Sequence, residues 1–63
     1  MRVVAVFDPP EAWKQFEEWR HQQAEAFAAV PKDEVRIDVG RTPDGDFVRV
    51  HVPDEHANRF PDS

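Results

Sequence analysis

Histidine and carboxylate side chains gather near the carboxyl end of this chain. His51, Asp54, Glu55 and His56 fall within six residues, and imidazole together with carboxylate is a donor set that zinc and manganese accept. The spacing fits no established ligand pattern, because His-Val-Pro-Asp-Glu-His has one residue too many for H-x-x-E-H and Pro53 interrupts any helix that would hold the ligands on one face. We therefore predict solvated histidines, with no metal ion and no other cofactor.

Asp8 is the second candidate for chemistry. A carboxylate at the end of the first predicted strand could hold a divalent metal if Asp38 or Asp46 approached it. The surrounding Asp-Pro-Pro-Glu also has a simpler interpretation. It is typical of a helix start, with Asp8 as the N-cap, Pro9 as the first helical residue and Glu11 as the capping-box partner. We predict this structural role for Asp8 and no catalytic residue.

The composition excludes several classes of site. The chain has 63 residues, no Cys, one Ser and two Gly, so it offers no thiolate ligand, no defensible serine triad and no glycine-rich phosphate loop. A domain of this size buries only about 60% of the surface that its unfolded chain exposes. Without disulfides to brace it, oligomerisation is the remaining source of stability.

The charge narrows the possible partners. Eight Lys and Arg residues face thirteen Asp and Glu residues, for a net charge of −5 that is spread along the chain. Nucleic-acid binding needs clustered basic residues, so we expect none; an acidic surface suits a basic protein partner or simple solubility. No apolar run approaches the ~20 residues of a membrane span, and nothing resembles a signal peptide, so we expect a cytoplasmic protein without membrane contact.

One long helix is predicted over about residues 9–30, with Pro31 ending it. Apolar side chains recur on one face at helical spacing. Gln23 interrupts this stripe and Arg20 lies beside it. Either Arg20 lays its aliphatic stem over the neighbouring aromatic residues, or this part of the helix meets a second chain. The stripe consists of Ala12, Phe16, Trp19, Phe27 and Val30, with Trp13 at its margin.

Three strands complete the predicted fold. Residues 3–7 form an apolar run, residues 35–39 and 47–52 alternate in polarity, and the turn over 42–46 joins the last two as a hairpin. The sequence thus predicts an α+β domain of order βαββ over residues 1–53, with a three-stranded mixed sheet and the helix on one face. Two sheet orders fit. We favour the third strand at the centre, which makes the chain the first part of a split β-α-β, ferredoxin-like arrangement, over a central second strand.

A short tail follows, over residues 54–63. We expect one or two helical turns and then a frayed end, with Ala57 and Phe60 on the same side of the turns. The sheet face opposite the helix needs a cover, because the first strand is apolar on both sides. Either the tail supplies that cover through Phe60, or another subunit does.

The predicted interaction surface is this sheet face. Arginine and aromatic residues are enriched at protein interfaces, and we expect an Asp38–Arg49 pair across the strands. The face is predicted to carry Val4, Val6, Arg36, Asp38, Phe47, Arg49 and His51.

These observations predict an interaction module without enzymatic activity. It would self-associate as a homodimer, or dock on a larger protein, through the open sheet face or the exposed edge of the first strand. The alternative hypothesis is a minimal metal-dependent hydrolase or nuclease that uses Asp8 with a second carboxylate, or the His51 and His56 cluster.

Overall fold

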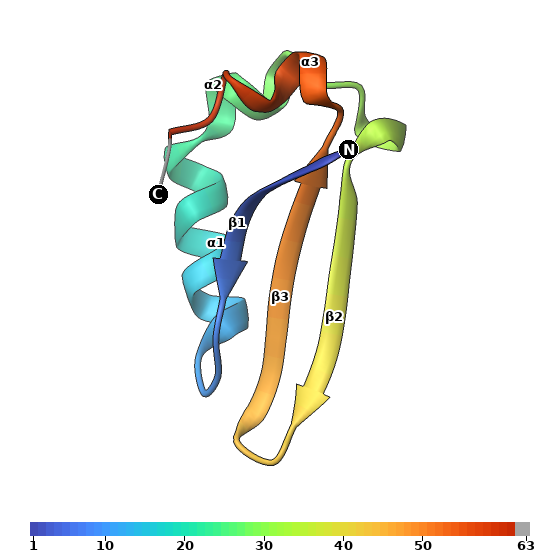
Figure 1. Cartoon of the computed structure of the whole chain (residues 1–63). Coiled ribbons are helices and arrows are strands. Elements are labelled where there is room, and N and C mark those ends of the chain that lie inside the picture. The colour runs from blue at the N-terminus through green and yellow to red at the C-terminus, as the bar shows by residue number, and fades with distance from the viewer. Residues whose placement is uncertain (62–63) are drawn as a thin grey trace.

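The chain folds into a small α+β domain with a three-stranded sheet. The computed structural model describes residues 1–61 (Figure 1). Its elements in chain order are β1 (Arg2–Phe7), α1 (Ala12–Gln22), α2 (Ala24–Ala28), the 3-10 turn η1 (Lys32–Glu34), β2 (Arg36–Thr42), β3 (Gly45–Val52) and α3 (Asp54–Ala57). The predicted frayed end over residues 62–63 lies outside the described residues.

The strand order is β1-β3-β2, and both neighbouring pairs are antiparallel. The favoured order, with the third strand central, is therefore confirmed (Figure 1). The predicted mixed sheet is wrong, because β3 separates β1 from β2, the two strands that run in the same direction. The sheet is antiparallel throughout.

The hairpin between β2 and β3 forms where the sequence predicts it. Gly45 has a φ of 130°, a conformation that side chains disfavour. The Thr42 hydroxyl donates to the Gly45 carbonyl oxygen at 2.8 Å and accepts from the Asp44 amide at 3.2 Å. These hydrogen bonds fix the turn that joins β2 to β3.

Two short helices replace the single long helix of the prediction. α1 ends at Gln22, and Gln23 leaves helical geometry with φ −102° and ψ 25°. A continuous helix would point the Gln23 amide into the apolar stripe. The break turns the chain instead, and the Phe27 ring comes to lie with its centroid 5.3 Å from that of Trp19. The helix is therefore interrupted at Gln23, the polar residue within the apolar stripe.

The first helix also begins later than predicted. α1 starts at Ala12, with Glu11 at the N-cap position and no side-chain capping bond. The predicted cap at Asp8 is therefore wrong. Proline restricts the residue before it to extended conformations, so Pro10 prevents Pro9 from serving as the first helical residue. Helical geometry becomes available only after both prolines.

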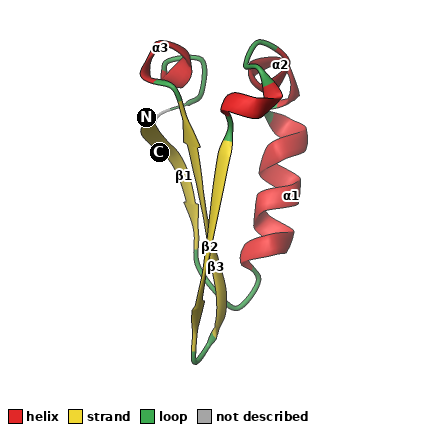
Figure 2. Ribbon diagram, turned by 90° about the vertical axis from the view of Figure 1, so that its right-hand side faces the viewer, coloured by secondary structure: helices red, strands yellow, loops and turns green. Residues whose placement is uncertain are grey.

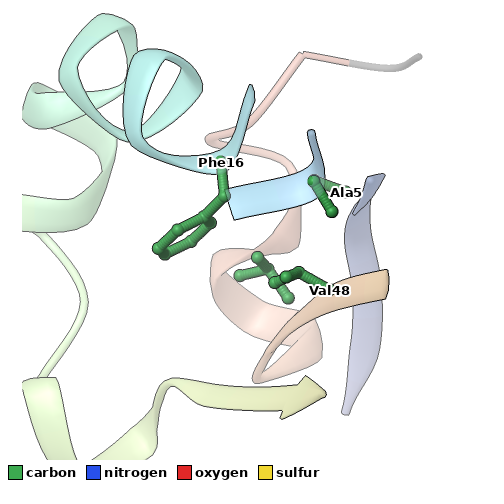
Figure 3. Packing of buried hydrophobic residues seen from close by; sticks show 5 residues of the cluster. Ala5, Phe16 and Val48 are labelled. Atoms are coloured by element: carbon green, nitrogen blue, oxygen red, sulfur yellow. The ribbon is translucent and has the colours of Figure 1, made fainter. Parts of the chain in front are cut away.

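The core lies between the sheet and the helices. Val48, Val50 and Val52 of β3 are fully buried, as expected for alternate residues of a central strand. Figure 3 shows Val48 packed with Ala5 of β1 and Phe16 of α1. A second cluster joins Val30, Val52, Ala57 and Phe60.

Phe60 packs with the helices. Its ring stacks on Trp19 at a centroid distance of 5.7 Å and an interplanar angle of 22°, and meets Phe27 edge-on at 5.0 Å. The tail therefore contributes its aromatic residue to the core on the helix side of the sheet. Phe60 is accordingly not the cover for the opposite face.

Candidate functional site

The predicted interaction surface is the sheet face turned away from α1, called here the outer face. Figure 2 views the sheet nearly edge-on, with α1 on one side only. The strand register places His51 opposite both Val3 and Arg36, and Arg49 opposite both Val6 and Asp38. The outer face thus carries Val3, Val6, Arg36, Asp38, Phe47, Arg49 and His51, which include six of the seven predicted residues.

Val4 is the exception. A bulge between Val3 and Ala5 shifts the register of β1 against β3, and Val4 packs against both core clusters. Val3 takes the outward position and is 43% exposed. Simple alternation along a strand cannot reveal such a bulge, because the bulge inserts one residue into the period of two.

Phe47 and Gly40 form a close contact on the outer face. The two residues are paired across β2 and β3, and a Cβ atom at Gly40 would overlap the Phe47 ring. The ring therefore lies over the glycine. The Arg49 guanidinium carbon lies 5.0 Å from the ring centroid, a cation–π distance. Arg49 contacts Phe47 in this way, and the predicted ion pair with Asp38 is replaced.

Asp38 contacts His51 instead. Its Oδ2 lies 2.8 Å from Nε2 of the imidazole, whose side chain is 20% exposed. The contact is not a directed hydrogen bond, since Nε2 has no bond partner of suitable angle among the described residues. It becomes an ion pair when the imidazole is protonated. The polar contacts of the outer face thus lie on β2 and β3, whereas its exposed apolar side chains, Val3 and Val6, lie on β1.

A second open surface lies on the helix side of the sheet. Ile37 and Val39 are paired with Val50 and Val48, so all four point to the same face. The β3 residues are fully buried, yet Ile37 is 37% and Val39 is 47% exposed. The reason is the position of α1, which packs against β3 and β1 and leaves β2 at the uncovered edge (Figure 1).

A groove follows this uncovered edge between α1, α2 and β2. We call it the β2 groove; its volume is about 590 Å³. Phe16, Phe27, Val35 and Ile37 line its apolar part, while Glu17, Arg20, His21 and Lys32 also border it. The sequence pattern marks Ile37 as core-facing. It cannot show whether one helix is wide enough to cover three strands.

Trp13 extends the apolar surface along α1. Trp13, Glu17 and Arg20 follow one another at helical spacing, and Glu17 and Arg20 line the β2 groove together with Ala24. Trp13 therefore lies on the groove side of the helix. Its side chain is 46% exposed, although its ring meets Phe16 edge-on at 5.9 Å. The exposed large apolar residues Trp13, Ile37 and Val39 thus flank one region.

The histidines of the metal hypothesis are separated in the structure. His51 lies on the outer face with Asp38, whereas His56 joins Glu55 and Glu34, their possible ligand atoms all within 4.8 Å of one another. Within residues 1–61, this is the one group of three or more such residues that could hold a metal ion, and it does not include Asp8. Sequence analysis missed Glu34, because η1 brings it to α3 from a distant part of the chain.

The geometry of this group argues against a metal centre. Both glutamates are exposed. The Nδ1 atom of His56 is buried and finds no hydrogen-bond partner in the described part of the chain, while Nε2 lies 3.9 Å from Glu55 Oε1. A metal-bound imidazole normally donates its second N–H to an acceptor that fixes the ring. We therefore assign no metal-dependent chemistry to this group.

The surfaces described above are the features of residues 1–61 from which a function can be proposed. No helix in residues 1–61 combines the length and the apolar character needed to cross a membrane. No protein-family model, curated protein or solved structure matches the chain.

Proposed function

We propose that this protein is an interaction module without enzymatic activity that self-associates as a homodimer through the β2 groove. The observation that carries the proposal is the exposure of Ile37 and Val39 on the same sheet face that buries Val48 and Val50. An apolar surface removed from water contributes about 25 cal/mol per Å². A second molecule over β2 would cover the part of the sheet that α1 leaves open.

The clustering of exposed apolar side chains supports this proposal, and so does the small core of the domain. Exposed apolar side chains are common singly, but a cluster of them beside an apolar groove is typical of an interface. Trp13 is one member of the cluster, and tryptophan is among the residues that contribute most at interfaces. Within residues 1–61 the core has nine buried hydrophobic residues, of which three are alanines, and self-association would bury further apolar surface.

Charge does not prevent two acidic copies from meeting here. The chain carries a net charge of −5, which opposes self-association at long range. Beside the groove, however, Glu17 is accompanied by Arg20, His21 and Lys32. The local surface is therefore not acidic, and a second copy would meet both signs of charge. A basic protein is the corresponding alternative partner for the rest of the acidic surface.

Two matched lysine variants test the proposal. Val39→Lys places a charge on the groove side of β2, and Val6→Lys places one on the outer face, at comparable exposure of 47% and 54%. We expect Val39→Lys to weaken association and Val6→Lys to leave it unchanged, as measured by static light scattering over a concentration series. Circular dichroism controls for folding.

The opposite pattern would assign association to the outer face, as sequence analysis predicts. Wild-type protein that stays monomeric at about 100 μM, a concentration that would detect weak dimers, would overturn the proposal.

A further inference from the structure

We infer that the occupant of the β2 groove is the α1 helix of a second copy, antiparallel to its own counterpart about a two-fold axis between Glu17 and Arg20. This inference rests on the proposed function and adds the geometry of the contact. The axis would pair Glu17 with the partner's Arg20 and, by symmetry, Arg20 with the partner's Glu17. One interface would then hold two pairs of opposite charge.

The residues from Trp13 to Ala24 form a pattern that is symmetric about its centre. Trp13 lies four residues before Glu17, and Ala24 lies four residues after Arg20. In a two-fold dimer the same patch meets itself, so the axis that pairs Glu17 with Arg20 also places Trp13 near the partner's Ala24. Ala24 is the first residue of α2, and it lines the groove together with Glu17 and Arg20. The stripe pairs an acid with a base and a large side chain with a small one.

The monomer presents this stripe to the groove. Glu17, Arg20 and Ala24 line the groove, and Trp13 precedes them at helical spacing. Arg20 and Glu17 already approach one another at 3.5 Å, with side chains about half exposed at 51% and 54%. Both charged groups therefore remain accessible to a partner. The Trp13 side chain is likewise about half exposed, at 46%, although its ring contacts Phe16.

Two other symmetric arrangements of the same helices pair like charges. A parallel pair in register places Glu17 beside the partner's Glu17, and an antiparallel pair with its axis at Arg20 brings the two arginines together. Like charges in contact disfavour an interface, which is how charge pattern selects register. The antiparallel register proposed here is the one that satisfies both charges together with Trp13 and Ala24.

The groove also offers room for the tryptophan. Ala24 and Ala28 both line it, and these small side chains leave space at the end of the stripe that would face the partner's Trp13. Tryptophan is enriched among the interface residues that contribute most to binding, and such residues fill well-packed pockets. Removing Trp13 should therefore weaken the dimer without removing a buried core residue.

Charge-swap variants test the register. Glu17→Arg places two arginines in contact at both symmetric positions, and Arg20→Glu does the same with two glutamates. Each variant alone should self-associate about tenfold more weakly than wild type, from two unfavourable pairs of surface strength. An equimolar mixture of the two should form a one-to-one heterodimer, because both pairs then have opposite charge. Sedimentation equilibrium measures both results.

Matched controls carry the same charge changes on the solvent-facing side of the helix, outside the stripe. Glu18→Arg and Lys14→Glu alter exposed residues of α1 that helical spacing places away from the stripe, and they should leave association unchanged. Trp13→Ala is an independent variant that should weaken association while circular dichroism shows unchanged helix content.

The outcomes separate the register from the proposed function. If Glu17→Arg and Arg20→Glu each associate as tightly as wild type, or if their mixture is no stronger than either alone, the two-fold register is wrong while self-association stands. If the controls weaken association equally, the effect is one of net charge and the register is again overturned. A monomeric wild type would overturn both.

Discussion

The imidazole Nε2 of His51 lies 2.8 Å from the Oδ2 atom of Asp38, although Asp38 is paired across the strands with Arg49. The carboxylate thus contacts the diagonal neighbour and leaves the guanidinium group over the Phe47 ring, at 5.0 Å from its centroid. Two separate contacts replace the single ion pair that the register alone suggests. These two contacts involve His51 and Arg49, the polar side chains of β3 on the outer face.

We expect the Asp38–His51 contact to add little stability. The Asp38 side chain is 45% exposed, and partly exposed ion pairs are worth about 0–1 kcal/mol. A double-mutant cycle of Asp38→Asn and His51→Gln, followed by urea unfolding, should give a coupling free energy within that range. Coupling above about 2 kcal/mol would show a much stronger, desolvated pair.

Gly40→Ala should destabilise the domain and displace the Phe47 ring. The added Cβ atom would overlap the ring. Because Phe47 is only half-buried, the ring can move outward, so we expect a loss of about 1 kcal/mol, at the low end for an overpacked site. Chemical denaturation measures the loss. In a Phe47→Ala background the same substitution should cost less, and an equal cost in both backgrounds would contradict the contact.

Phe60→Ala should be the most destabilising of these substitutions. Phe60 is 5% exposed and packs against both Trp19 and Phe27. Truncating a buried phenylalanine costs about 3–5 kcal/mol, a large share of the stability of a small domain. Thermal unfolding should show a much lower midpoint. A shift similar to that of an exposed substitution such as Arg59→Ala would mean that the tail is not part of the core.

Asp8→Ala should leave stability nearly unchanged. Asp8 is exposed, and α1 begins only at Ala12 with no side-chain cap. Substitutions at such surface positions usually change the unfolding free energy by less than about 0.5 kcal/mol. A loss of about 1 kcal/mol or more that Asp8→Asn restores would instead show the N-cap role that the sequence pattern suggests.

Local sequence signals predicted the elements of this fold but not their interruptions. The alternation of Val48, Val50 and Val52 identifies β3 and its buried side, and Gly45 identifies the hairpin. The helix break at Gln23 and the bulge at Val4 depend on how apolar side chains fit together across elements. No periodicity within one segment contains that information.

The candidate surfaces were predictable to different degrees. Strand alternation predicted most of the outer face, whereas the β2 groove depends on where α1 lies across the sheet. That position follows from packing of Phe16 and Trp19 against β1 and β3, a tertiary property. The signal that could have indicated the groove is Arg20 beside Gln23 in the apolar stripe, for which contact with a second chain was one of two interpretations.

Small-angle X-ray scattering over a concentration series tests the central claim most directly. The monomer has a Cα radius of gyration of 11.6 Å and a mass of 7.3 kDa. If the domain self-associates through the β2 groove, the forward scattering of wild-type protein should rise toward twice the monomer mass, with a larger radius of gyration, and Val39→Lys should hold the monomer values at the same concentrations. Monomer values for the wild type throughout the series, up to about 100 μM, would contradict the account.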